Sequence, residues 1–155
     1  MVQVKLKVEG MKELQKSMKK LGKVPQKHVT ASAKKGMNIV LKQAKANAPV
    51  DTGELRSGII LIGERSRTKG KKVYRLVFDR EKNDIFQKKN KKGKVTGYYP
   101  VSQEYGYFTK NGRYIPGFYF IHNALNENTQ KVAQTIVDTM KKKIDDEIRK
   151  AGLRK

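Results

Sequence analysis

The sequence predicts an α+β fold, with an antiparallel sheet of about four or five strands packed against two main helices, one of them a long C-terminal helix. Two periodicities support this class. Apolar and polar residues alternate over residues 2–8, which is typical of a half-buried strand. Apolar residues recur at three- and four-residue steps over residues 25–48 and 124–151, as on amphipathic helices.

Length and composition limit the possible classes of protein. A chain of 155 residues fits a single domain, residues 1–155, with a basic loop or hairpin arm at about 79–97. The chain has no cysteine, which excludes a disulfide framework and thiolate metal sites. The first residues lack the apolar core of a signal peptide, and no apolar run approaches the roughly 20 residues that span a bilayer. We therefore expect synthesis in the cytoplasm and no membrane partner.

The strongest compositional feature is charge. The 36 basic and 14 acidic residues give a formal net charge of +22, which favours nucleic acid, an anionic membrane or an acidic protein as partner. Residues 65–94 contain 13 basic and 3 acidic residues, a local net charge of +10. The basic excess is therefore concentrated in one part of the chain.

The first half of the chain reads as alternating elements. A strand at residues 2–8 precedes a short helix at residues 11–21, and a second helix runs from about Pro25 to Ala48. Its small residues Ala33, Gly36 and Ala44 permit another element to approach closely, through core packing or at a subunit interface.

A central turn, residues 49–55, follows this helix. Pro49 ends the helix, Asp51 or Thr52 can cap a new short turn with Glu54 as the partner in a capping box, and Leu55 points to the core. Residues 59–63 and 73–78 then predict a β-hairpin. The first of these strands is apolar on both faces, which is typical of a central strand covered on one side by helices and on the other by a further element, such as a neighbouring subunit.

The second half is less regular until its last element. Residues 79–97 predict a long exposed loop or extended hairpin arm around Ile85 and Phe86. Residues 98–120 hold nine aromatic residues among glycines and prolines, which favours short strands and tight turns rather than helix. A long helix follows, from about Ala124 to Ala151.

The candidate catalytic and metal-binding residues are better explained by structure. Asp51-Thr52-Gly53 is the tripeptide of aspartic proteases, but here it follows a helix and Pro49 instead of an apolar strand. His28 and His122 lack the spacing of zinc ligands, and no phosphate-binding glycine motif is present. We predict no enzyme, no cofactor and no metal.

Two blocks of sequence resemble a known family. The first is Ala46-x-Ala48-Pro49-Val50-Asp51-Thr52-Gly53-x-Leu55-Arg56-Ser57-x-Ile59, and the second is Glu104-Tyr105-Gly106 followed by Ile115-Pro116-Gly117-Phe118. Both resemble the tail-component proteins of tailed phages, the neck, tail-completion or head-tail joining proteins of siphophage type. The segment 80–97 reads as a basic insertion.

The resemblance implies a structural virion protein of a phage or prophage neck that forms a ring, by family symmetry a hexamer, and joins head to tail or completes the tail. It implies adjacent neck or tail proteins as partners, with contact to DNA in the channel as a further possibility. The residues predicted for the structural turn are Pro49, Asp51, Thr52, Gly53 and Leu55. The residues predicted for interface or DNA contact are Lys88, Lys89, Lys91, Lys92, Lys94, Tyr98, Tyr99, Tyr105 and Phe118.

The alternative is a non-specific nucleic-acid-binding protein. Such proteins hold phosphates with basic side chains and stack bases on aromatic rings. The basic segment 65–94 and the neighbouring tyrosines have this composition.

Overall fold

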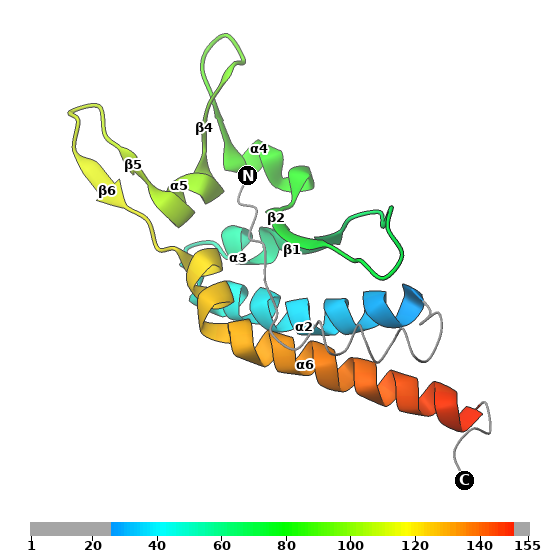
Figure 1. The fold of residues 1–155 in the computed structure, drawn as a ribbon. Coiled ribbons are helices and arrows are strands. Elements are labelled where there is room, and N and C mark those ends of the chain that lie inside the picture. Colours follow the sequence, from blue (N-terminus) through cyan, green and yellow to red (C-terminus); the bar gives the residue numbers. More distant parts are fainter. Residues whose placement is uncertain (1–25, 151–155) are drawn as a thin grey trace. The chain divides into compact units, whose positions relative to one another are not determined.

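The computed structural model describes residues 26–150 and confirms the α+β class (Figure 1). The strand and helix predicted at residues 2–8 and 11–21 lie outside the described residues. The described helices are α2 (Gln26–Asn47), α3 (Glu54–Gly58), the 3-10 turn η1 (Arg80–Lys82), α4 (Asn83–Phe86), α5 (Tyr99–Tyr105) and α6 (Phe120–Lys150). The described strands are β1 (Ile59–Gly63), β2 (Tyr74–Phe78), β3 (Gln87–Lys89), β4 (Val95–Tyr98), β5 (Gly106–Phe108) and β6 (Tyr114–Pro116).

The described strands form three separate two-stranded sheets, where the sequence predicted one sheet of four or five strands. Each sheet pairs strands that are neighbours in the sequence, β1 with β2, β3 with β4 and β5 with β6. The last two pairs are antiparallel hairpins of three or four residues a strand. Their side chains are largely exposed or polar, so they lack the apolar face that would bury them in a common sheet.

The described residues divide into two compact units. Unit 1 comprises residues 26–39, 62–75 and 128–150, and unit 2 comprises residues 40–61 and 76–127. Because α2, the β1–β2 hairpin and α6 contribute residues to both units, neither unit is a continuous stretch of chain. The prediction of a single domain stays a prediction.

Unit 1 is held together by the packing of α2 against α6. Gly36 lies on α2 where an added Cβ would come within 2.7 Å of Ile136 Cγ1 and 3.3 Å of Val132 Cγ1. At the other end of this contact, the ring of buried His28 hydrogen-bonds the Glu147 carboxylate at 2.9 Å. The prediction that small residues on α2 admit a close neighbour is therefore right for Gly36, whose partner is a helix of the same chain.

Unit 2 has an aromatic core. Its buried residues Ala48, Leu55, Ile59 and Phe120 pack with Leu41, Leu76, Phe78 and Ile121. The ring of Phe78 is central, because it meets the rings of Phe86, Tyr98 and Phe120 edge to face, with centroids 6.3–6.4 Å apart. Such geometry places the positive ring edge against the negative face of its neighbour.

Three predictions for the second half need correction. The aromatic segment was expected to lack helix, but α5 occupies Tyr99–Tyr105, with Pro100 in its first turn, where a missing N–H costs nothing. The final helix begins at Phe120, four residues before the predicted start. Within the predicted arm, η1 and α4 come first and bury Phe86, so the projecting hairpin begins only at Gln87.

Candidate functional site

The central turn joins α2 to α3 inside unit 2. Backbone hydrogen bonding of α2 continues to Ala48, whose N–H donates to Ala44 O at 3.0 Å, and the helix then stops before Pro49 as predicted. Leu55 is buried in the core, also as predicted, whereas Val50, Asp51 and Thr52 are exposed.

The predicted cap of this turn is wrong. Gly53, and neither Asp51 nor Thr52, occupies the N-cap of α3, and no side chain caps the helix. Gly53 has a φ of 83°, a left-handed conformation that glycine adopts without the clash of a Cβ. The nearest substitute is Thr52, whose Oγ1 lies 3.5 Å from the Glu54 N–H. The Glu54 carboxylate, predicted to complete a capping box, instead forms an ion pair with Lys82.

A shallow hollow opens beside the central turn. It has a volume of about 210 Å³ and is lined by residues 51–55, Ile85 and Tyr99. Ile85 is 58% exposed, so one wall of the hollow is an apolar side chain that the rest of unit 2 does not cover. The lining holds two acidic residues, Asp51 and Glu54, and no basic one, although the chain as a whole has 36 basic and 14 acidic residues.

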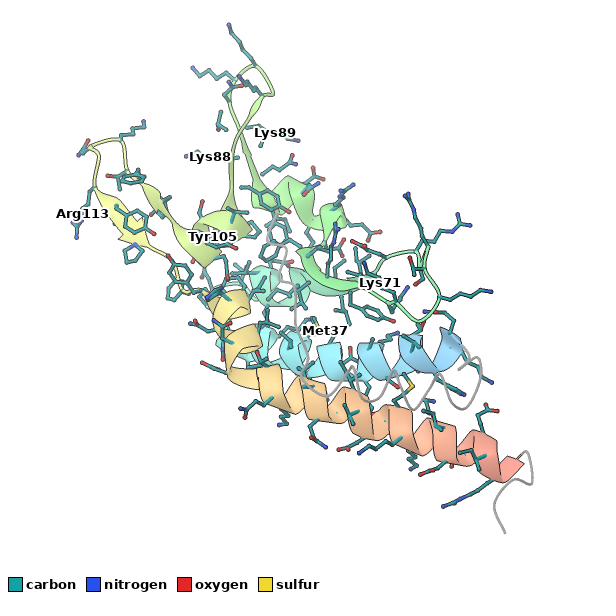
Figure 2. The ribbon with its side chains drawn as sticks, in the orientation of Figure 1. Met37, Lys71, Lys88, Lys89, Tyr105 and Arg113 are labelled. Atoms are coloured by element: carbon teal, nitrogen blue, oxygen red, sulfur yellow. The ribbon has the colours of Figure 1, made fainter. Side chains whose placement is uncertain are left out.

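The predicted lysines lie on one element, the β3–β4 hairpin, which we call the basic hairpin. Lys88, Lys89, Lys91, Lys92 and Lys94 are all exposed. Figure 2 labels Lys88 and Lys89, which both belong to strand β3 of this hairpin. Its turn is held by the Asn90 side chain, which accepts the N–H groups of Lys92 and Lys94 at 3.0 Å each. The structure thus presents the five charges together to solvent.

The tyrosines beside this hairpin have different environments. Tyr98 packs on Phe78 and Phe86, and its hydroxyl donates to Asn83 Oδ1 at 3.3 Å, so it belongs to the core of unit 2. Burial raises the pKa of the Tyr98 phenol. Tyr99 is 40% exposed and lines the hollow. Of these two predicted contact residues, only Tyr99 has a ring exposed to solvent.

Buried Glu104 organises the second family-like block of the chain. Its two carboxylate oxygens accept the backbone N–H groups of Ile121 and His122 at 3.0 Å each. These are orphan donors of the first turn of α6, which attract negative charge through the helix dipole. Glu104 therefore fixes the start of the long helix from a position 17 residues before Ile121, the first of its two partners.

The backbone around Glu104 is close-packed. The N–H groups of Phe118 and Tyr119 donate to the carbonyls of Gln103 and Glu104 at 2.8 and 2.9 Å. An added Cβ at Gly117 would lie 2.3 Å from Glu104 O, so only glycine fits there. Tyr119 has a φ of 50°, unusual for a residue other than glycine, and its ring packs on Tyr105 with centroids 6.0 Å apart. The Glu104-Tyr105-Gly106 and Pro116-Gly117-Phe118 segments are thus two sides of one contact.

This contact is the base of a second hairpin, β5–β6, which we call the aromatic arm. Phe108 pairs with Tyr114 across the strands, their ring centroids 5.2 Å apart, and Phe108 is 73% exposed. The turn carries Lys110, and Arg113 lies where the turn meets β6, alongside the arm in Figure 2. Tyr107 and Phe118 are also exposed, at 46% and 59%. An exposed aromatic surface of this kind is unusual on a protein without a partner.

The phenols at the base and along the arm have raised pKa values. Burial, with Glu104 and Tyr119 nearby, raises the pKa of Tyr105. A hydrogen bond with Tyr119 is the main cause of the raised pKa of Tyr114. Since a phenol ordinarily titrates near pH 10, both remain neutral donors at physiological pH. The Tyr114 hydroxyl donates to Tyr105 O at 2.5 Å and ties the arm to its base.

Metal-binding and membrane-spanning features are absent from the described residues. Residues 26–150 contain no group of three or more His, Cys, Asp or Glu residues that could hold a metal ion. No helix in this part of the chain is long and apolar enough to cross a membrane. His28 pairs with Glu147, and His122 is exposed beside the Tyr119 ring.

Sequence reasoning missed two features of this surface. Glu104 was noted only as part of a family block and was given no role. The available signal was an acidic residue beside Tyr105-Gly106, ahead of the start of the long helix. Sequence reasoning also omitted Phe108, Tyr114 and Ile85 from the contact residues, because spacing alone does not show which aromatic residues a short hairpin exposes.

Comparison with known proteins gives one match. Residues 12–112, well over half of the chain, match the model of a family described as "Bacteriophage HK97-gp10, putative tail-component". No curated protein and no solved structure matches the chain.

Proposed function

Because the chain belongs to the HK97-gp10-like family of phage tail components, we propose that it forms a ring in the phage neck that joins head to tail or completes the tail. As a tail component it is a structural protein of the virion and contacts other tail or neck proteins. The neck position, the ring and its copy number are the parts that we propose. The role needs no catalysis and no cofactor.

The exposed surfaces of unit 2 support self-association. The aromatic arm exposes Phe108, Tyr107 and Tyr114, and the hollow exposes Ile85 and Tyr99. Exposed apolar side chains that cluster on a small protein often mark contacts with another chain. Two different patches on one chain favour a head-to-tail contact, which closes into a ring when the rotation between copies divides a full turn.

The symmetry of phage tails favours six copies, so we propose a hexamer. The ring would assemble in the host cytoplasm on an adjacent neck or tail protein. Its DNA channel would then explain the charge of the chain, since lysines facing the channel would meet phosphate.

A second candidate function is non-specific nucleic-acid binding by the basic segment 65–94. It is favoured by one observation, the five lysines that the basic hairpin presents together. The neighbouring aromatic residues weaken this candidate, because Tyr98 is packed in the core and cannot stack on a base. We therefore rank DNA contact as a property of the assembled ring.

Particle imaging tests the proposal. Phage produced without this protein should accumulate unjoined heads and tails or unfinished tails, and wild-type particles should show a ring at the neck that is absent from the deletion. Supplying the wild-type chain from a plasmid is the control for loss of a neighbouring gene product. Normal, infectious particles in its absence would exclude a role in joining or completion.

A further inference from the structure

The aromatic arm and the hollow are complementary in shape and chemistry. The arm projects, and it combines the exposed rings of Phe108 and Tyr114 with the cations Lys110 and Arg113. The hollow is concave, with the apolar wall of Ile85 and Tyr99 and the acids Asp51 and Glu54. At about 210 Å³ it is smaller than the roughly 300–1,000 Å³ of pockets for drug-sized ligands, so it suits a side chain better than a small molecule.

One chain does not fill its own hollow. Both features belong to unit 2, and Figure 1 shows the β5–β6 hairpin extending well away from α3, whose first residues line the hollow. The exposure of Phe108, at 73%, agrees with an arm that has no partner within its own chain. The arm is also held firmly at its base, since Glu104, Gly117 and the Tyr114 hydroxyl fix where it leaves α6. A pre-formed arm loses little conformational freedom when it docks.

We propose that the aromatic arm of one copy of this chain docks into the hollow of the next copy. Phe108 and Tyr114 pack against Ile85 and Tyr99, while Lys110 and Arg113 approach Asp51. Charge favours this site: the net charge of +22 makes two copies repel, and the lining of the hollow offers the Asp51 carboxylate and no basic residue, although its other acid, Glu54, is already paired with Lys82. The inference rests on the proposed ring and names the surfaces that build it.

Cross-linking gives a geometric test because the chain contains no natural cysteine. The full-length variant with Asn111→Cys on the arm and Thr52→Cys in the hollow is treated with a short thiol-reactive cross-linker, in purified particles and in concentrated solution. We expect a ladder of covalent oligomers, because a head-to-tail contact links every copy to the next. Asn111→Cys with Lys142→Cys, an exposed position on α6, is the matched control and should give no ladder.

Charge reversal gives a second test that does not depend on cysteine placement. Chains with Lys110→Glu and Arg113→Glu, or with Asp51→Lys, should each associate roughly tenfold or more weakly than wild type, because like charges meet in the contact. Mixing the two variants should restore association, since each reversed arm then meets a reversed hollow. Lys141→Glu with Lys142→Glu on α6 is the control, and it should not weaken association to a comparable degree.

The outcomes separate this inference from the proposed function. An oligomer of wild-type mass without the cross-linked ladder, or with no rescue on mixing, would overturn the arm-in-hollow contact and leave the ring standing. A ladder that also forms in the control would overturn it equally. A chain that is monomeric in particles and in solution would remove both the ring and this contact.

Discussion

Glu104 is the residue that most clearly connects sequence to structure in this chain. It is 2% exposed, and its carboxylate is used entirely by the start of α6. A buried acid of this kind is a candidate catalytic group in many proteins, but here both oxygens already accept backbone donors. Its role is to hold α5, the aromatic arm and α6 in one arrangement.

We predict that Glu104→Gln lowers the free energy of unfolding by about 1–3 kcal/mol, because the amide places a donor against a helix N–H and removes the charge at the helix end. Urea unfolding of both chains measures the difference. Glu127→Gln, an exposed position further along α6, is the matched control. An unchanged unfolding midpoint in Glu104→Gln would contradict the capping role.

At the central turn, the structure reverses an expectation about single residues. Asp51→Ala should change the free energy of unfolding by no more than about 0.5 kcal/mol, because Asp51 is exposed and caps nothing. Gly53→Ala should cost about 1–2 kcal/mol, since φ is 83° there. Thermal or urea unfolding compares the two variants. A larger loss for Asp51→Ala than for Gly53→Ala would restore the Asp51 cap.

The sequence could not have distinguished these two caps. Asp51 and Glu54 have the spacing of a capping box. Gly53, which lies between them, can adopt the left-handed conformation that makes it the N-cap residue instead of Asp51. The choice depends on Glu54 reaching Lys82, a residue 28 positions away, which no local pattern reveals.

At the scale of elements, periodicity predicted the long elements well and the short ones poorly. The ends of α2 and most of α6 follow from apolar spacing and Pro49. The short helix α5 and the division into separate hairpins were not predicted, because a few residues carry too little periodicity and tertiary contacts such as those of Phe86 and Glu104 decide their state.

The contact between α2 and α6 allows a test of helix packing. Gly36→Ala would stabilise an isolated helix by about 1 kcal/mol, but in unit 1 the new Cβ would lie 2.7 Å from Ile136 Cγ1. We expect a net loss of stability, recovered in part by the double variant Gly36→Ala with Ile136→Val, which removes the Cδ1 carbon that would lie 3.0 Å from the new Cβ. A stabilised single variant would show that this contact is looser than described.

The same contact predicts a pH dependence. The hydrogen bonds from His28 and Lys27 hold the pKa of Glu147 below its ordinary value of 4.5. A carboxyl whose pKa falls on folding stabilises the fold above its ordinary pKa, and this contribution disappears as pH falls through the lowered folded value. Melting temperatures of wild type and Glu147→Gln should therefore differ at pH 7 and converge as the pH falls below the lowered pKa of Glu147. A difference that persists at the lowest pH would contradict this origin.

At the scale of the whole molecule, the family was visible in the sequence because its two blocks are structural. The first block forms the central turn, and the second forms the Glu104 contact with Gly117. The surfaces that we assign to assembly were only partly predicted: the lysines and Tyr99 are exposed as expected, whereas Tyr98 is packed in the core.

The charge of the molecule predicts how DNA binding depends on salt concentration, and this dependence distinguishes the two proposed functions. Replacing Lys88, Lys89, Lys91, Lys92 and Lys94 with Gln should flatten the log-log dependence of duplex binding on salt by up to about 0.9 for each of these side chains that binds a phosphate in the wild type. A control that replaces five exposed helix lysines, Lys34, Lys35, Lys131, Lys141 and Lys142, removes the same charge elsewhere. We expect weak DNA binding by the free subunit. Tight binding that only the hairpin variant abolishes, with particles still joining normally, would favour the nucleic-acid function.

The mass of the protein in its assembled state tests the central claim most directly. Native mass measurement of the purified chain at high concentration, together with particle imaging to count its copies at the neck, should give a closed oligomer, which we expect to be a hexamer. A ring that forms only on the particle also agrees with the account. A protein that is monomeric in concentrated solution and present as single copies in purified particles would contradict it.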